Sequence, residues 1–262
     1  MSAPTNTDPL RQQYERDGYL VVQNVLDEAL IADAQRHVDW YRSQHPGATP
    51  EQLHGELTDV RDPFYFHIAR DERLLEIAAQ FVGSDIAVFA TGYIFKPPHS
   101  DLKILWHQDG SYWPLEPMEV VTLWVAISES TPANGCMRVI PGTHRMDLHP
   151  MQTDRSERNL LNSRIDPALV EEERAVDLIL RPGDVSIHHP NILHGSGANG
   201  SDDWRVNLVI RYIPTSTRIT RQPWERAFLA RGRAVPNLNQ YLPEPVWAAG
   251  KYPRFQGCDR YA

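Results

Sequence analysis

The sequence predicts a mainly-β protein in which helices precede a β-sandwich or barrel. Helical periodicity is confined to the first 85 residues, and many short β-like runs follow with no helical pattern between them. The length of 262 residues fits one folded unit. Mainly-β sandwiches and barrels commonly reach roughly 200–250 residues as a single domain, so the length gives no reason to divide the chain.

The N-terminal part predicts three helices and one strand. Residues 9–17 form a short polar pattern, and the apolar run at 19–22 after Gly18 predicts a first strand. Between Asp27 and about His45, apolar residues recur every three or four positions, which predicts an amphipathic helix with Asp27 as its N-cap. The polar stretch 45–63 is interrupted by prolines and is expected to be a long loop. Another helix is expected over about 71–81, ending near Gly83.

The rest of the chain predicts strands and then an irregular tail. Short apolar runs separated by Pro, Gly, Asn and Ser predict strands at 86–96, 104–109, 119–127, 136–140, 175–180, 184–189, 192–194 and 205–213. From Thr215 onward the sequence is rich in Pro, Arg and aromatic residues. We expect this segment to wrap the barrel as ordered coil, with a short helix near 224–230.

Composition excludes several classes of protein. The 26 Lys and Arg against 34 Asp and Glu give a net charge of −8 without long single-sign blocks, which argues against a nucleic-acid partner. No run of about 18 apolar residues occurs and the first ten residues do not resemble a leader peptide, so no membrane association is expected. The two cysteines do not form a metal-binding spacing and fit a reducing, cytoplasmic compartment. The oligomeric state is not indicated.

A candidate metal site comes from two strands. His107 and Asp109 are two positions apart, so on a strand their side chains leave the same face. His194, on a later strand, offers a third ligand. Two imidazoles and one carboxylate with open positions are typical of non-haem Fe(II) oxygenases, whereas zinc prefers a closed or three-ligand tetrahedral site. His188 and His189 lie close enough in sequence to His194 to be rival ligands.

The sequence pattern of the strand that begins at Arg205 predicts polar side chains inside the barrel. Alternation places Arg205, Asn207, Val209 and Arg211 on one face. The other face is apolar throughout and is expected to be covered by the helices. A charged guanidinium inside a barrel requires an anionic partner, which is either a bound dicarboxylate or an acidic residue of the protein.

Five short motifs, in order and spacing, resemble the phytanoyl-CoA dioxygenase family of Fe(II)- and 2-oxoglutarate-dependent oxygenases. They are Lys96-Pro97-Pro98, His107-Gln108-Asp109 with Tyr112-Trp113, Trp124, Asn134-Gly135-Cys136 leading to Pro141-Gly142-Thr143-His144, and His194-Gly195-Ser196-Gly197 with Arg205 eleven residues after its His. The resemblance spans roughly residues 12–214.

The resemblance implies a fold and a set of roles. The fold would be a double-stranded β-helix (jelly roll). Together with the length and the sequence patterns, this predicts a single oxygenase domain over 1–262, with about 1–85 as its helical part, 86–214 as its core and 215–262 as its C-terminal wrap. His107, Asp109 and His194 would bind iron. Arg205 and Ser196 would hold the distal carboxylate of 2-oxoglutarate, and Trp124 would line that pocket.

The reaction implied by the resemblance is hydroxylation of a small molecule, with O₂ consumed and succinate and CO₂ released. Related iron halogenases have Gly or Ala in place of the carboxylate ligand, so the presence of Asp109 favours hydroxylation. Two alternatives remain open: a cupin-like isomerase or hydrolase that uses another metal, and a non-catalytic jelly-roll binding protein. The first alternative leaves Arg205 and Ser196 without a cosubstrate.

The substrate is not identified by the sequence, but candidate contacts are. Arg211 lies six residues beyond Arg205 on the same face, so it would require either an acidic substrate or a protein carboxylate as its partner. An acidic substrate would be compact, with the aromatic residues forming its apolar wall. The residues expected to line the substrate pocket are Tyr93, Gln108, Tyr112, Trp113, Asn207 and Arg211.

Overall fold

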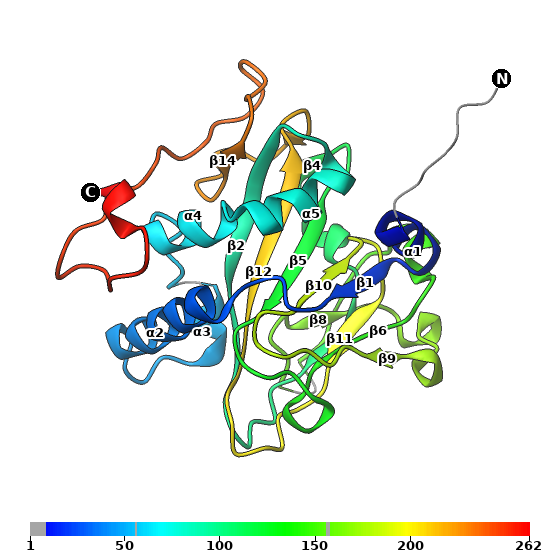
Figure 1. Cartoon of the computed structure of the whole chain (residues 1–262). Helices are drawn as coiled ribbons and strands as arrows, with labels where there is room; N and C mark the ends of the chain where they lie inside the picture. The colour runs from blue at the N-terminus through cyan, green and yellow to red at the C-terminus, as the bar shows by residue number, and fades with distance from the viewer. Residues whose placement is uncertain (1–8, 56, 156–157) are drawn as a thin grey trace.

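A computed structural model describes residues 9–55, 57–155 and 158–262. The helices are α1 (Pro9–Asp17), α2 (Glu28–Gln44), α3 (Pro50–His54), α4 (Pro63–Ala69) and α5 (Glu72–Val82). Within the described ranges, no helix is long and apolar enough to cross a membrane. Helices α4 and α5 lie in front of the major sheet with α2 and α3 to their lower left, and α1 lies apart next to β1 (Figure 1). The sequence predicts a mainly-β fold with N-terminal helices, as observed.

The strands form two main antiparallel sheets. The major sheet has the order β1 (Tyr19–Val22), β10 (Val185–His188), β5 (Val121–Ala126), β12 (Arg205–Pro214), β2 (Ile86–Lys96) and β14 (Phe228–Arg231). The minor sheet has the order β3 (Ile104–His107), β11 (His194–Ser196), β6 (Met137–Val139) and β9 (Val176–Asp177). Two short pairs lie outside them: β13 (Arg218–Ile219) with β4 (Leu115–Glu116), and β7 (Gln152–Thr153) with β8 (Ser163–Arg164).

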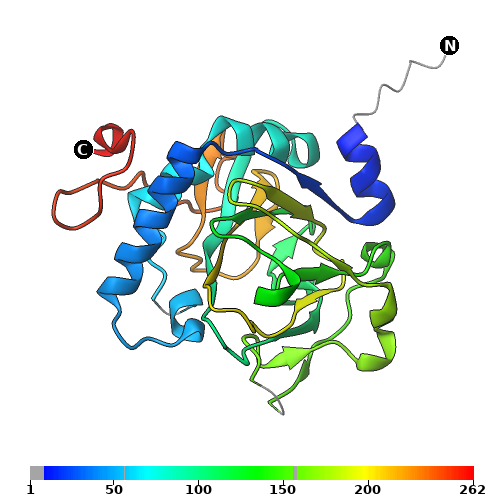
Figure 2. The ribbon, with the colours of Figure 1, turned by 60° about the horizontal axis from the view of Figure 1, so that its bottom comes forward.

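Strand β12 separates the two interiors of the molecule. Its apolar face (Val206, Leu208, Ile210 and Tyr212) belongs to the cluster shared with the helices. Its other face contributes Val209 to a second cluster, between the two sheets, with Ile104 and Met137 of the minor sheet. The alternation predicted for this strand is confirmed. Figure 2 shows the helices outside the strands and the two sheets facing each other.

Two helices lie within residues 45–69, where no helix was predicted and where 45–63 was expected to be a loop. Helix α3 begins with a capping box between Thr49 and Gln52 and has Pro50 in its first turn. Helix α4 begins with Asp62 as its N-cap, followed by Pro63. Proline is tolerated in the first helical turn, where its missing N–H has no intrahelical partner. Here the prolines mark helix starts, and the prediction of an uninterrupted loop was wrong.

The C-terminal segment differs from the prediction in two ways. The helix expected near 224–230 is absent, and Phe228–Arg231 instead pairs with β2 as strand β14, covering that edge of the major sheet. The last residues pack on helices more than on the barrel. Phe255 contacts Phe64 of α4 (ring centroids 5.4 Å apart), and the Gln256 N–H donates to Asp33 of α2 at 2.8 Å.

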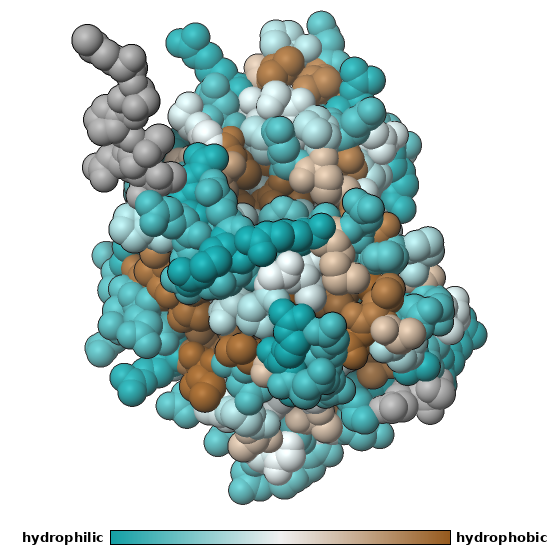
Figure 3. Space-filling model, turned by 90° about the vertical axis from the view of Figure 1, so that its right-hand side faces the viewer, coloured by the Kyte–Doolittle hydropathy of each residue, from teal (hydrophilic) through white to brown (hydrophobic). Residues whose placement is uncertain are grey.

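The surface on the side of α1 and the minor sheet is mixed. Hydrophobic residues there form separate patches interrupted by hydrophilic ones (Figure 3).

Candidate metal and cosubstrate site

The pairing of β3 with β11 brings the two predicted histidine ligands together. His107 and His194 are direct partners in the antiparallel register, and their ring centroids lie 4.0 Å apart. Each ring contacts the backbone carbonyl two residues earlier: His107 Nδ1 lies 2.9 Å from Leu105 O, and His194 Nδ1 lies 3.1 Å from Ile192 O. A carbonyl only accepts, so both Nδ1 atoms carry the proton and both Nε2 lone pairs are free for a metal.

Asp109 completes the cluster from outside the strand. Strand β3 ends at His107, and Asp109 opens the 3-10 helix η1 (Asp109–Tyr112), so the predicted strand to residue 109 is two residues too long. The turn is fixed by Gly110, whose N–H donates to Pro190 O at 2.9 Å. Asp109 Oδ1 lies 3.5 Å from His107 Nε2 and 4.0 Å from His194 Nε2.

The three side chains fit a metal ion. One ligand atom from each lies within 4.8 Å of the others, and all three residues are buried. Burial opposes ionisation of Asp109, but the charge of Arg211 and the neighbouring imidazoles outweigh it and hold its pKa well below the usual range. Burial, followed by the proximity of His107, lowers the pKa of His194. The site therefore presents a carboxylate at Asp109 and a neutral imidazole at His194, as an Fe(II) site requires.

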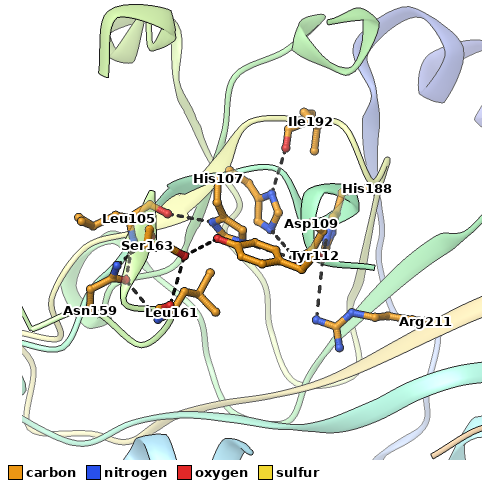
Figure 4. A network of polar contacts seen from close by, with 11 residues as sticks. Leu105, His107, Asp109, Tyr112, Asn159, Leu161, Ser163, His188, Ile192 and Arg211 are labelled. Carbon is orange, nitrogen blue, oxygen red and sulfur yellow. Dashed lines mark hydrogen bonds and ion pairs between the residues drawn. The ribbon is translucent and has the colours of Figure 1, made fainter. Parts of the chain in front are cut away.

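The rival histidines occupy other positions. His188 Nε2 lies 3.7 Å from Asp109 Oδ2, the oxygen that does not face His107 and His194, and its ring centroid lies 4.8 Å from that of His194, but His188 is not part of the three-residue cluster. Figure 4 shows His188 and Arg211 approaching Asp109 from that side. His189 faces away, with its ring 5.9 Å from that of Tyr14 and its Nδ1 accepting the Asn191 N–H.

Arg205 is fully buried on the inner face of β12 and lacks any ion pair among the described residues. Its exposure is 0%, and none of its three guanidinium nitrogens has a hydrogen-bond partner. Its guanidinium carbon lies 5.5 Å from the centre of the Trp124 ring. Burial lowers the pKa of Arg205 to about 10, so the side chain remains charged at neutral pH. A buried cation without an anion indicates a site for an anionic ligand.

Other residues of the predicted cosubstrate site also have buried polar atoms without partners. The Ser196 hydroxyl, the Trp124 Nε1 and both polar atoms of the Asn207 amide are buried without partners. Asn207 is two residues from Arg205 and four from Arg211 on one strand face, which places it nearer the Arg205 end. These groups provide the donors that a carboxylate ligand beside Arg205 requires.

A cavity lies beside the metal cluster. Besides the three candidate ligands, it is lined by residues of both sheets, of α3 and of the 160–161 loop. They include His54, His188, Ser196, Arg211, Trp124, Ile104, Met137, Leu160 and Leu161. Sequence reasoning did not find His54, which lies on α3. The capping box at Thr49 and Gln52 was the signal for that helix.

The predicted aromatic wall is divided. Tyr112 is partly exposed, its hydroxyl lies 2.7 Å from Ser163 Oγ, and its ring lies 6.2 Å from that of His107. Figure 4 shows Tyr112 between Ser163 and the metal cluster. Trp113 lies under Arg211, whose guanidinium carbon is 5.1 Å from the ring centre. Neither residue is among those that line the cavity.

Tyr93 and Gln108 lie elsewhere than predicted. Tyr93 pairs with Leu208 and therefore shares the helix-facing side of the sheet, where its hydroxyl lies 2.8 Å from His37 Nδ1. The Gln108 amide donates to Asp147 O and Asn191 O and accepts from the His149 N–H, so it holds two loops together. All its polar atoms are used within the protein, and neither residue is available to a substrate in the cavity.

Comparisons with known proteins agree with this site. A sequence profile described as Phytanoyl-CoA dioxygenase (PhyH) matches residues 14–207. The chain belongs to the phytanoyl-CoA dioxygenase family. This is a family of Fe(II)- and 2-oxoglutarate-dependent dioxygenases, which confirms the family and the cofactors predicted from the motifs.

The chain is 29% identical over 220 residues to the peroxisomal phytanoyl-CoA dioxygenase of Homo sapiens, covering 74% of this chain and 64% of that one. It is 25% identical over 262 residues to an ectoine dioxygenase of Sphingopyxis alaskensis, covering 87% and 85%. The chain thus spans less than two thirds of the human enzyme's length.

Solved structures with the same fold include two oxygenases. The nickel complex of ThoJ, a non-heme monooxygenase, has a TM-score of 0.71 at 25% identity, covering 90% of this chain and 89% of that one. EctD from S. alaskensis with 2-oxoglutarate and 5-hydroxyectoine has a TM-score of 0.70 at 22% identity, covering 93% and 91%. These similarities confirm the predicted fold class.

Proposed function

We propose that this protein is an Fe(II)- and 2-oxoglutarate-dependent dioxygenase that hydroxylates a compact, anionic small molecule, with the whole chain acting as one oxygenase domain. The observation that supports it best is the buried guanidinium of Arg205, which has no anionic partner. Arg205 lies on the inner face of β12, between the two sheets, and the three-ligand metal cluster lies in the same interior. A metal-dependent isomerase or hydrolase has no use for this cation. A buried, unpaired charge is also costly to retain in a protein that binds nothing there.

In this proposal, His107, Asp109 and His194 hold the iron. The carbonyls of Leu105 and Ile192 fix both imidazole tautomers, so the Nε2 lone pairs point to the metal before it binds. Arg205 pairs with the distal carboxylate of 2-oxoglutarate, Ser196 adds a hydroxyl donor, and Trp124 lines the pocket. Asn207 is assigned to the cosubstrate end of the cavity. Iron with 2-oxoglutarate supplies the O₂-dependent oxidation that inserts oxygen into a C–H bond and releases succinate and CO₂.

The proposed charge of the substrate rests on the balance of charges. Arg211 has a protein carboxylate nearby, since its Nη2 lies 3.8 Å from Asp109 Oδ2. That carboxylate also serves the metal. The charges of Fe(II) and dianionic 2-oxoglutarate cancel, Asp109 offsets one arginine, and one positive charge remains for Arg205 and Arg211 together. A low-dielectric cavity with this excess favours an anionic substrate.

The compartment is proposed from the cysteines. Cys136 and Cys258 are both unpaired and buried, which supports a reducing, cytoplasmic environment.

The experiment is anaerobic reconstitution with Fe(II) and 2-oxoglutarate, followed by air and a panel of small acids. We expect one iron per chain, the visible charge-transfer band of an Fe(II)–2-oxoglutarate chelate, and substrate-dependent succinate release. His194→Ala should lose iron and the band, whereas the neighbouring His189→Ala should keep both. Equal iron content and an equal band in the two variants would refute the ligand assignment.

A further inference from the structure

His54 is a cavity residue with no assigned role. It ends α3, which packs against β2, and it lines the cavity together with Asp109 and Arg211. This segment lies close to Gly92 of β2, which pairs with Val209 on the inner face of the sheet. A Cβ at Gly92 would lie 3.4 Å from Thr58 Cγ2 and 3.9 Å from His54 O, which are ordinary contact distances. His54 and Thr58 therefore lie against the inner face of β2.

The hydrogen bonding of His54 defines what it offers a ligand. Its Nδ1 lies 3.0 Å from the Tyr93 carbonyl, which accepts only, so Nδ1 carries a proton and donates it. Burial lowers the pKa of His54 to about 4, with the Tyr93 hydrogen bond opposing the shift and Arg211 adding to it. The ring is therefore neutral at pH 7. Its Nε2, the remaining polar atom of a cavity-lining side chain, is a hydrogen-bond acceptor.

Arg211 offers the complementary chemistry. Its contact with Asp109 at 3.8 Å exceeds hydrogen-bond length, so the carboxylate balances its charge without using its donors. The Arg211 Nε is buried and has no partner. Trp113 packs on the guanidinium and holds its orientation. Arg211 therefore retains N–H donors and a positive charge at the wall of the cavity.

We propose that Arg211 and His54 form a two-point substrate site, in which Arg211 binds an oxyanion and His54 Nε2 accepts a hydrogen bond from an O–H or N–H of the same molecule. The proposal rests on the function proposed above and narrows its substrate class. The substrate is a compact acid that carries its own hydrogen-bond donor. A plain carboxylate satisfies Arg211 and leaves His54 unpaired, which costs affinity.

The test uses simple acids as probes of the anaerobic enzyme loaded with Fe(II) and 2-oxoglutarate. Propionate carries the anion alone, lactate and 3-hydroxypropionate add a donor at two distances, and propionamide lacks the charge. Binding is followed by calorimetry and by the shift of the charge-transfer band. We expect at least one hydroxy acid to bind about threefold to tenfold more tightly than propionate, and propionamide not to bind measurably.

Variants separate the two points of recognition. Arg211→Gln should weaken all the acids about tenfold or more. His54→Phe should remove the preference for the hydroxy acid and leave propionate unchanged, whereas His54→Gln, which keeps an acceptor, should retain part of it. His45→Phe, at the end of α2, is the matched control and should behave as wild type.

The outcomes distinguish the two proposals. If wild type never forms the charge-transfer band, the proposed function fails. If the band forms but no hydroxy acid is preferred over propionate, or if His54→Phe keeps the preference, the two-point site is wrong and the proposed function stands. Should His54→Phe fail to fold, the wild-type comparison and His54→Gln still decide.

Discussion

An arginine that is fully buried without an anion costs free energy in the ligand-free protein, and Arg205 is in this position. The cost is recovered when a carboxylate binds, so the residue serves ligand binding at the expense of stability. Both effects can be measured on the same variant.

We therefore predict opposite effects of Arg205→Met on stability and on binding. Without ligand, the variant should be more stable than wild type by about 1–4 kcal/mol, since an unpaired charge is replaced by an apolar side chain. Its 2-oxoglutarate affinity should fall roughly 30-fold to several thousand-fold, the cost of removing one partner of a desolvated charge pair. Denaturant unfolding and titration of the charge-transfer band measure the two quantities.

Arg205→Lys is the matched control for this prediction. It keeps the charge but not the planar fork, so it should restore 2-oxoglutarate binding only in part. An unchanged 2-oxoglutarate affinity in Arg205→Met would remove the assignment.

The burial of Lys96 leads us to predict that the free energy of unfolding depends on pH. It is buried opposite Arg205 in the β2–β12 pairing, and its Nζ donates to Gly197 O. Burial, followed by the charge of Arg205, lowers the pKa of Lys96 to about 6. In the unfolded chain the pKa is about 10.4, so between these values the unfolded state binds more protons and stability rises with pH.

The measurement compares wild type with Lys96→Met. The difference in their free energies of unfolding should shift in favour of wild type from pH 6 to pH 10, by up to about 1.4 kcal/mol per pH unit, and should be flat below pH 6. The control Lys251→Met changes an exposed lysine and should lack this slope. A flat difference from pH 6 to 10 would mean that Lys96 stays protonated in the fold.

At the scale of elements, the distance between β3 and β11 determines the metal site. A Cβ at Gly195, between His194 and Ser196, would lie 2.8 Å from Ile104 O, a backbone atom of β3. At Gly197 in the same motif, no heavy atom would lie within 4 Å. The two glycines thus differ in whether the neighbouring strand must move.

Gly195→Ala should therefore push β11 away from β3 and weaken metal binding. We expect at least a tenfold loss of Co(II) affinity and a lower unfolding midpoint, because His107 and His194 face each other across this pair. Gly197→Ala should leave both nearly unchanged. Equal effects of the two substitutions would show that strand spacing does not control the site.

Local sequence signals predicted most elements and some of their ends, including both ends of α1 and β1 and the Asp27 cap of α2, but they did not predict the strand pairing. Amphipathic periodicity predicted α2 and α5, and alternation predicted the faces of β12. The starts of α3 and α4 were missed because prolines were interpreted as loop signals, although Thr49-Pro50 and Asp62-Pro63 are helix caps. Strand β14 forms by covering the edge of β2, a long-range interaction that no local pattern encodes.

For the candidate site, motif resemblance predicted the residues that meet at the metal cluster, whereas the same-face argument assumed a strand to residue 109 that ends at His107. The prediction that Tyr93 faces the cavity was wrong. Its face depends on the register between β2 and β12, in which Tyr93 pairs with Leu208 on the helix-facing side. The assignment of Gln108 to the substrate pocket was wrong because its amide is used by loop residues, whose positions depend on tertiary packing. Its partners are Asp147, His149 and Asn191.

At the scale of the whole molecule, the helical cluster that packs on the apolar face of β12 lies on the opposite side of the major sheet from the cavity, and α3 also reaches the cavity through His54. Stability contributed by that cluster should therefore be separable from function. His37 of α2 connects the helical layer to the sheet. Its Nδ1 lies 2.8 Å from the Tyr93 hydroxyl, its Nε2 lies 2.9 Å from Asp62 Oδ2, and its ring stacks on Phe64 with centroids 4.5 Å apart. All four residues are buried.

We predict that His37→Phe destabilises the fold by about 3 kcal/mol, because it removes the imidazole partner of Asp62 Oδ2 and of the Tyr93 hydroxyl, both of which are buried. In the folded protein, Co(II) affinity and the Fe(II)–2-oxoglutarate band should stay within about twofold of wild type. Tyr93→Phe removes one of the two unpaired groups, so the double variant should be less destabilised than the sum of the single variants. Denaturant unfolding and metal titration of all three variants provide the measurement. A large loss of metal or 2-oxoglutarate binding in folded Tyr93→Phe would instead connect the helical face of β2 to the cavity and restore Tyr93 to the site.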